Sequence, residues 1–460
     1  MSVRVRFAAA LLAIPSFAAA TAAAQDDPAA PRAEVAAAAQ ALQDKVVAWR
    51  RDIHQHPELS NRETRTGQLV AEHLRSLGLE PRTGIAHTGV TAVLKGGRPG
   101  PRIALRADMD ALPVTEQTGL PFASKVTDTY RGQTTGVMHA CGHDAHTAIL
   151  MGVAEALAGM REELPGEVLF VFQPAEEGAP EGEEGGAALM LKEGVFEDFT
   201  PDAVFGLHVF STLNADQVGV RAGPMMAASD RFGLKVIGRQ THGSRPWGGV
   251  DPIVASAQII SQAQTIVSRQ MDISKQPVVV TFGAINGGIR YNIIPDEVEL
   301  VGTIRTFDED MRKDVFARLN HIAEHVAAAN GATVEAQIPA DAGNPVTFNN
   351  EALTERMRPS LAAAAGAGKL VELPLIMGAE DFSLYAQQVP GMFFFVGATP
   401  VGEDPATAPS NHSPQFDVDE SALDLGFRAM LQVALDYLEG GNESAAAQSP
   451  VAPAPLAGRL

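Results

Sequence analysis

The chain has 460 residues, of which 45% are hydrophobic and 20% charged, and its formal net charge is −20 at pH 7. This size and composition are typical of a globular protein with two or three domains of about 100–200 residues each. The acidic excess argues against nucleic-acid binding and against attraction to anionic membranes, because both depend on clustered Lys and Arg.

The first residues of the chain have the pattern of an export signal. A basic start precedes a short apolar run, and Ala22-Ala23-Ala24 resembles a signal-peptidase site. We therefore expect a signal peptide over residues 1–24 and an exported protein, periplasmic or secreted after cleavage near Ala24. A membrane anchor is the competing interpretation, but the apolar run is short and Pro15 interrupts it. No membrane segment is expected in the mature protein.

Composition also divides the rest of the chain. Residues 25–40 are rich in Ala, Pro and Gln and are predicted to form a loose linker, whereas residues 440–460 are predicted to be a disordered tail. Between them we predict a catalytic domain in two parts, residues 41–218 and 334–439. The intervening residues, 219–333, are predicted to be a lid or dimerisation domain.

The catalytic domain shows alternating strand and helix patterns. Four short apolar runs predict buried strands: Arg102–Ala107, Glu167–Phe172, Ala203–Leu207 and Gly391–Val396. Segments with helical periodicity lie between them, for example His146–Met160 and Gly185–Glu193. This alternation predicts an α/β fold, with a mostly parallel sheet covered by helices on both faces.

Polar side chains follow each of these strands. The residues concerned are Asp108 and Asp110 after the first strand, Glu176 and Glu177 after the second, His208 at the end of the third, and His412 beyond the fourth. Ligands bind beyond the carboxyl ends of the strands in such sheets. The sequence therefore predicts that these side chains converge on one active site.

Residues 219–333 have a different pattern of elements. The predicted order is strand, helix, strand, strand, helix, strand, over Arg231–Gly238, Pro252–Arg269, Pro277–Ile285, Glu297–Thr306, Asp308–Asn330 and Val334–Ile338. Asp251 and Pro252 make a good helix start, because a carboxylate can cap the first turn and Pro suits its first position. The order predicts a ferredoxin-like α+β domain inserted into the catalytic domain.

The only cysteine of the chain lies in the segment Met138–His146, which also contains three histidines and an aspartate. A lone cysteine cannot form an internal disulfide, so this cluster needs another explanation. Thiolate, imidazole and carboxylate together suit a borderline-soft divalent metal ion. A metal-dependent enzyme is the favoured interpretation.

Two neighbouring carboxylates, Glu176 and Glu177, should point in different directions as they leave their strand. One can bind metal while the other acts as a base on water that the metal activates. A plausible set of five ligands is Cys141, His143, Glu177, His208 and His412. Five ligands suit two ions about 3.5–4 Å apart better than one tetrahedral ion. Asp110 would then hold an imidazole in its ligating tautomer.

With these residues in this order, the sequence resembles a known family: the metal-dependent amidohydrolases of aminoacylase, carboxypeptidase G and peptidase T type. Within that family it is similar to the branch of hippurate hydrolase and indoleacetyl-amino-acid hydrolase. The matching segments, in order, are Arg51–Glu58, Asp108–Pro113, Met138–Asp144, Phe172–Glu177, Leu207-His208, Asn292–Pro295, Met377–Phe382 and His412–Phe416. Any one segment would be weak evidence, but eight in order are highly specific.

The resemblance implies a zinc-exopeptidase-like catalytic fold, the same five ligands, and two divalent metal ions per subunit, with Glu176 as general base. It also implies that His242 reaches across a homodimer interface, possible also in a higher oligomer, to polarise the substrate carbonyl. Asn292 and Arg305 become candidates for binding the substrate carboxylate or the oxyanion. The implied substrate is a small N-acyl or N-aroyl amino acid.

Other site residues are assigned more modest roles. We interpret His54, His139 and His146 as structural or ligand-positioning residues, and Asp381 as a candidate for fixing a nearby ligand. The chain also departs from the wider family, where many members have His in place of Asp108 and a bridging Asp in place of Cys141. This departure leaves Zn, Mn, Co and Ni open as the metal.

Three alternatives remain. A metal-dependent dipeptidase or carboxypeptidase would share the same site. A cysteine hydrolase would use Cys141 as nucleophile and His143 as base, but their spacing of two residues makes direct pairing awkward and leaves the other polar residues unused. A non-catalytic binding relative would be expected to lose the base or a ligand, whereas this chain has both.

Overall fold

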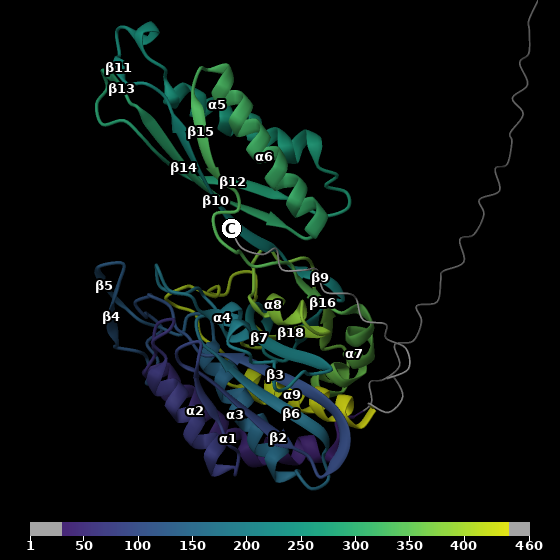
Figure 1. Cartoon of the computed structure of the whole chain (residues 1–460). Helices are drawn as coiled ribbons and strands as arrows, with labels where there is room; N and C mark the ends of the chain where they lie inside the picture. Colours follow the sequence, from purple (N-terminus) through teal and green to yellow (C-terminus); the bar gives the residue numbers. More distant parts are fainter. Residues whose placement is uncertain (1–29, 441–460) are drawn as a thin grey trace, which may run out of the picture.

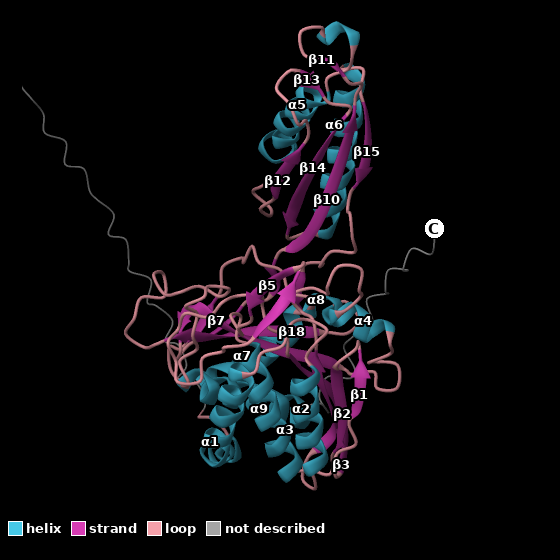
Figure 2. Ribbon diagram, turned by 90° about the vertical axis from the view of Figure 1, so that its left-hand side faces the viewer, coloured by secondary structure: helices cyan, strands magenta, loops and turns pink. Residues whose placement is uncertain are grey.

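In the computed structural model, which describes residues 30–440, the chain forms two lobes joined by a narrow connection (Figure 1). The predicted signal peptide lies outside the described residues, as does the predicted tail except for Gly440. The large lobe contains a mixed sheet with helices on both faces, and the small lobe contains a second sheet with helices on one face (Figure 2).

The large lobe is built on an eight-stranded sheet with the order β1-β2-β6-β3-β7-β18-β8-β17. Its strands are β1 (Arg82–Ile85), β2 (Gly89–Lys95), β3 (Arg98–Asp108), β6 (Pro165–Gln173), β7 (Ala203–Asn214), β8 (Val218–Val220), β17 (Leu370–Glu372) and β18 (Gly391–Thr399). The central strands β6, β3, β7 and β18 are parallel, and antiparallel pairs occur at β1-β2, β2-β6 and β18-β8. These central strands are the four predicted from apolar runs, so the α/β fold with a mostly parallel sheet is confirmed.

Helices bury both faces of this sheet. One face packs on α1 (Ala33–Gln55), α2 (Thr64–Ser76), α3 (His143–Gly159), α7 (Glu351–Ala365) and α9 (Ser421–Gly440), and the other on α4 (Gly186–Lys192) and α8 (Phe382–Ala386). Alternate residues of β3 show the division, because Ile103 and Leu105 join the first core whereas Ala104 joins the second. Burial of both faces explains why these strands appear as continuous apolar runs.

The predicted linker over residues 25–40 is wrong for residues 33–40, because α1 begins at Ala33. Alanine has the highest helix propensity, and Val35 and Ala39 lie one helical turn apart on the buried face. The Arg32 guanidinium also binds Asp436 of α9, with Nε and Oδ1 2.6 Å apart. Packing against the core therefore orders a segment whose composition resembles that of a linker.

The small lobe has the predicted ferredoxin-like order. Its elements are β10 (Ala228–Ile237), α5 (Pro252–Thr265), β12 (Val279–Asn286), β14 (Glu297–Thr306), α6 (Glu309–Ala329) and β15 (Thr333–Gln337), with a π-helical turn η2 (Ile266–Gln270) after α5. The sheet order is β12-β14-β10-β15. The Asp251 carboxylate accepts the backbone N–H groups of Ile253 and Val254, as a capping residue should.

The boundaries of the small lobe differ from the predicted 219–333. At the start, β8 pairs with β18, and β9 (Gly223–Met226) pairs with β16 (Thr347–Asn349), so both strands belong to the large lobe. At the end, β15 pairs with β10 and belongs to the small lobe. Pairing with distant strands, which local composition does not reveal, sets these limits.

Two small ribbons complete the described structure. One joins β4 (Thr127–Tyr130) and β5 (Gln133–Gly136) on the large lobe. The other joins β11 (Thr241–His242) and β13 (Ile293–Ile294), near the 3₁₀ turn η1 (Pro246–Gly248), at the end of the small lobe remote from the large sheet (Figure 1). Among residues 30–440, no helix is both long and apolar enough to span a bilayer.

Candidate metal centre

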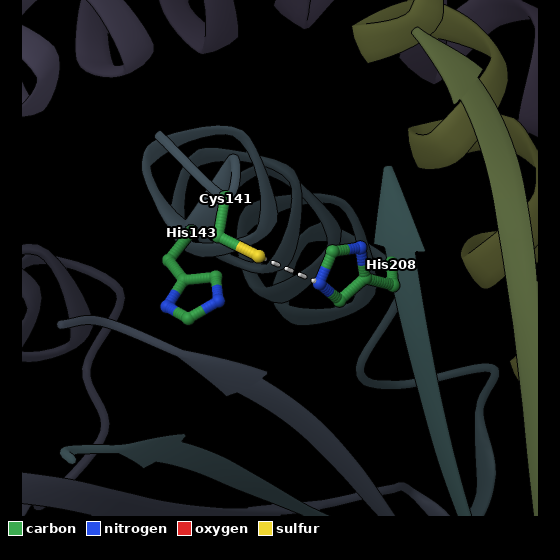
Figure 3. Close-up of side chains that lie close together, drawn as sticks. All are labelled: Cys141, His143 and His208. Atoms are coloured by element: carbon green, nitrogen blue, oxygen red, sulfur yellow. Dashed lines mark hydrogen bonds between the residues drawn. The ribbon is translucent and has the colours of Figure 1, made fainter. Parts of the chain in front are cut away.

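The five predicted ligands come together from four separate segments of the large lobe. Cys141, His143 and His208 form one group and Cys141, Glu177 and His412 a second, and in each group the potential ligand atoms lie within 4.8 Å of one another. Figure 3 shows the first group, with Cys141 and His143 from one turn facing His208 of β7. The thiol of Cys141 belongs to both groups.

A glycine makes this arrangement possible. Gly142 separates Cys141 from His143 and precedes α3, with φ at +93°. A Cβ at this position would lie 2.2 Å from Cγ2 of Val209, so the turn can approach β7 only with glycine. The tight turn directs both flanking side chains toward the strand that contains His208.

Direct polar contacts join the candidate ligands to one another. The Cys141 Sγ atom lies 3.3 Å from Nε2 of His208 and 3.2 Å from Nε2 of His412. The Glu177 Oε1 atom lies 3.0 Å from Nε2 of His412 and 4.0 Å from Nε2 of His143. Atoms that bind one cation approach each other in this way.

The hydrogen bonds at Nδ1 of the two buried imidazoles direct Nε2 of each ring into the cluster. His208 donates its Nδ1–H to the Val209 carbonyl at 2.7 Å, and His143 donates its Nδ1–H to Asp110 at 3.2 Å. Within residues 30–440, Nε2 of His143 is buried and lacks a hydrogen-bond partner. Such an atom costs about 1–3 kcal/mol unless something binds it. The donor set and the unpartnered Nε2 of His143 fit a divalent cation.

Asp110 connects the imidazole to the two glutamates. Besides His143, its carboxylate accepts the Ser60 hydroxyl at 2.8 Å and the backbone N–H groups of Glu176 and Glu177, each at 3.1 Å. One carboxylate thus fixes a candidate ligand and the loop that carries the predicted base. The structure places Asp110 where the sequence analysis expected a residue that orients an imidazole.

Glu176 points into a second group of carboxylates. It lies close to Glu380 and Asp381, and burial together with the charges of Glu380, Glu177 and Asp381 raises the pKa of Glu176 well above its usual range. An elevated pKa suits a group that accepts a proton and later returns it. The sequence analysis did not identify Glu380, which lies beside Asp381 in one of the matching segments.

Asp381 lies in a buried network around Arg106 instead of against a predicted ligand. The Arg106 guanidinium donates to Asp108, Asp381 and Gln173 at 2.8–2.9 Å and pairs with Glu380 at 2.8 Å. Asp381 also accepts the Gln173 amide and the Ala187 N–H. The position of Arg106 among the apolar residues of a predicted strand was a sequence signal of this network.

The three histidines predicted to be structural or ligand-positioning lie in polar or buried surroundings near the cluster. His146 uses both ring nitrogens, donating to Asp108 at 2.6 Å and accepting the Val209 N–H at 2.8 Å. His54 contacts Asp144 at 2.8 Å and Glu116 at 3.2 Å. His139 is buried among these groups, and burial lowers the pKa of its imidazole to about 4, so the ring is neutral.

The loop that holds His412 is fixed by its neighbour Asn411. The Asn411 amide donates to the carbonyls of Cys141 and Val209 at 3.2 and 3.1 Å, and its oxygen accepts the Ser211 N–H at 3.1 Å. His412 itself has φ at +70°. Sequence reasoning missed Asn411, whose position directly before His412 was the only available signal.

Three predicted site residues lie outside the cluster in the single chain. His242 lies in β11 and Asn292 directly precedes β13, at the remote end of the small lobe (Figure 1), and Nδ1 of His242 accepts the backbone N–H of Ser244 at 3.0 Å. Arg305 lies in β14, opposite Ser229 of β10 and Val279 of β12. His242 and Asn292 are therefore not assembled with the candidate ligands within one subunit.

The chain is similar to known proteins over most of its length. Residues 104–436 match the family model described as peptidase family M20/M25/M40. A relative named thermostable carboxypeptidase 2, from Saccharolobus solfataricus, is 40% identical over 397 residues, covering 86% of this chain and 96% of the relative. The IAA-amino acid hydrolase ILR1-like 4 of Arabidopsis thaliana is 39% identical over 397 residues, covering 86% of each chain.

A solved structure has the same architecture. The Bacillus subtilis YXEP protein, described as a dinuclear metal binding peptidase from the M20 family, superposes with a TM-score of 0.72 at 36% identity. The match covers 87% of this chain and 99% of that one, so it includes both lobes.

Proposed function

The chain belongs to peptidase family M20/M25/M40 and is a metal-dependent amidohydrolase, and on this premise we propose that it cleaves N-acyl or N-aroyl amino acids, hippurate-like in structure, using two divalent metal ions per subunit. The observation that carries the proposal is the position of Cys141, shared by two groups of candidate ligands. A thiolate at that point can bind two neighbouring ions, one in each group. The proposed ligands are Cys141 with His143 and His208, and Cys141 with Glu177 and His412.

Bound divalent ions would supply Lewis-acid chemistry, polarising the substrate carbonyl and making a nearby water more acidic. Zn, Mn, Co and Ni are all compatible with a set of thiolate, imidazole and carboxylate donors. Asp110 keeps Nδ1 of His143 protonated, so that Nε2 presents its lone pair to the cluster.

Glu176 carries the proton in the proposed reaction. Its carboxylate accepts a proton from water as the water oxygen attacks the carbonyl carbon of the amide. It then gives that proton to the amide nitrogen, the C–N bond breaks, and the products are a carboxylate and a free amino acid. The raised pKa of Glu176 favours the first transfer, because a more basic carboxylate accepts the proton of water more readily.

The remaining site residues are proposed to act across a homodimer. His242 and Asn292 lie far from the cluster of their own subunit, which supports delivery to the cluster of a second copy. There His242 would donate a hydrogen bond to the carbonyl oxygen, while Asn292 and Arg305 would bind the oxyanion or the substrate carboxylate.

A peptide substrate is the second candidate, favoured by the relative named as a carboxypeptidase. Hydrolysis of hippurate, N-acetyl amino acids and dipeptides by the same preparation would decide between the two classes. The protein would be assayed as purified, after chelation, and after reloading with each metal ion. Activity that is lost and then restored supports the proposal, whereas activity that survives complete metal removal would contradict it and favour a thiol nucleophile at Cys141.

Export is proposed from the sequence pattern of residues 1–24. Cell fractionation and N-terminal sequencing test it directly. A mature chain that begins near Gln25 in the periplasm or medium supports export, and an intact N-terminus in the cytoplasm contradicts it.

A further inference from the structure

Glu63 is a fully buried carboxylate that lies far from the metal centre in sequence and close to it in space. It directly precedes α2, and its side chain is 0% exposed. Its Oε1 atom accepts the backbone N–H groups of Asn61 at 3.0 Å and of Ala175 at 2.9 Å. Ala175 immediately precedes the two glutamates of the site, so Glu63 contacts the loop that presents them.

Three successive backbone N–H groups of this loop end on buried carboxylates. Ala175 donates to Glu63, and Glu176 and Glu177 donate to the two oxygens of Asp110. Ala175 also has φ at +53°, in the left-handed region that residues with a Cβ rarely adopt. The loop therefore needs external bonds to keep its shape, and Glu63 provides the bond at the strained residue.

We propose that Glu63 is a positioning residue that directs Glu176 and Glu177 by holding the left-handed turn at Ala175. This inference rests on the proposed roles of the two glutamates as base and ligand. Release of the Ala175 N–H would let the backbone rotate toward an ordinary φ. Both side chains that follow would then be displaced, because each residue's direction depends on the torsion before it.

The two oxygens of Glu63 have separate partners, so the contact with the Ala175 loop can be tested apart from the contact with Thr88. Oε2 contacts the Thr88 hydroxyl at 2.5 Å, whereas Oε1 holds the loop. Thr88→Val removes a partner of the same carboxyl group without touching Ala175. Glu63→Gln keeps an oxygen that can accept the Ala175 N–H, and its amide NH₂ can donate to Thr88.

The experiment compares Glu63→Ala, Glu63→Gln, Thr88→Val, Ala175→Gly and the double variant Glu63→Ala/Ala175→Gly. Metal affinity of each folded, chelator-treated protein is measured by titration with Zn²⁺, and kcat and KM are measured at saturating metal. Glu63→Ala should weaken metal affinity and lower kcat by about 10–100-fold, the range for loss of a group that orients a ligand. KM should change little.

Rescue separates positioning from general damage to the fold. The Zn²⁺ affinity and kcat of Glu63→Gln and Thr88→Val should remain within about 3-fold of those of the unsubstituted protein. Both variants keep an oxygen that accepts the Ala175 N–H, so the orientation of the ligand and base is preserved. Glycine favours the left-handed turn, so the double variant should recover part of the loss caused by Glu63→Ala. If Glu63→Ala does not fold, Ala175→Val replaces it, because a β-branched residue opposes the same turn and should reproduce the loss.

The proposal is overturned if Glu63→Ala or Ala175→Val leaves both affinity and kcat unchanged, if Glu63→Gln loses as much as Glu63→Ala, or if glycine at position 175 gives no recovery. Zn²⁺ affinity is measured without any substrate. Failure of every substrate would therefore contradict the proposed function, while the order of affinities would still decide the role of Glu63.

Discussion

At the scale of single residues, Glu63 and Asp110 show how buried carboxylates shape the site through backbone contacts. Neither is proposed to bind metal, yet together they fix the N–H groups of three consecutive residues. Sequence patterns identified Asp110 because it follows a predicted strand, but gave no reason to select Glu63, whose partner lies 112 positions away. Contacts of such separation leave no local periodicity to detect.

Burial of Glu63 also predicts a pH dependence of stability. Burial and the charge of Asp110 raise the pKa of Glu63 to about 8 from an ordinary value of 4.5. Between these values the folded state retains a proton that the unfolded state has released, so this contribution to stability falls as pH rises and is lost above about pH 8.

Urea unfolding of the chelator-treated protein at pH 5 and pH 8 measures this contribution. Glu63→Gln cannot ionise, so its free energy of unfolding should fall less between the two pH values than that of the unsubstituted protein. Equal slopes for the two proteins would contradict the elevated pKa.

At the scale of an element, the start of α3 depends on one glycine. Gly142→Ala would place a Cβ 2.2 Å from Cγ2 of Val209 at a residue with positive φ. We expect a loss of about 1–3 kcal/mol in the free energy of unfolding, as for other overpacked sites. Metal affinity should also fall, because the turn sets both Cys141 and His143.

Gly159→Ala is the matched control, since it lies at the last position of the same helix and has no atom within 4 Å of the added Cβ. It should be neutral or stabilising by about 0.5–1 kcal/mol. Chemical denaturation of both variants measures the difference. Equal stabilities would show that the close approach to Val209 is not required.

Elements with strong local signals were predictable, and elements defined by distant partners were not. The strand β14 has the predicted bounds Glu297–Thr306, and α6 begins at Glu309, one residue after the predicted start of the helix at Asp308. By contrast, β8 and β9 were assigned to the wrong lobe, because only their pairing with β18 and β16 decides their place. The start of α1 was missed for a similar reason, since packing orders an Ala-rich segment.

At the scale of the whole molecule, the candidate ligands join segments that are far apart in the chain. Cys141 and His412 are 271 positions apart, so metal binding would link early and late parts of the large lobe. A ligand that binds only the folded state stabilises it, by about 2.7 kcal/mol at a concentration 100 times Kd. Chelation should therefore lower Tm, and restoring the metal should raise it again.

Two variants separate binding from chemistry in that measurement. Glu176→Gln should keep the shift in Tm on adding metal but lose turnover by about 100-fold or more, as expected for removal of a general base. Cys141→Ala should lose both. A metal-dependent shift in Tm that is unchanged in Cys141→Ala would contradict the shared-thiolate site.

The remote position of His242 predicts complementation between inactive subunits. His242→Ala and Glu176→Gln should each be nearly inactive alone, but mixed dimers would contain one site with both groups intact. Random mixing in a symmetric dimer should restore about one quarter of full activity. Sedimentation tests the dimer itself, and absence of any recovery after subunit exchange would contradict action across the interface.

The single sulfhydryl of the chain is also a built-in reporter of the site. Because Cys141 is the only cysteine in 460 residues, a thiol-specific alkylating reagent can modify a sulfhydryl only at the site, at a rate slowed by the burial and raised pKa of that thiol. Intact-mass spectrometry of alkylated protein would then count blocked sites directly, molecule by molecule. Protection of Cys141 from the label would report the fraction of sites that hold metal, without any substrate or engineered tag.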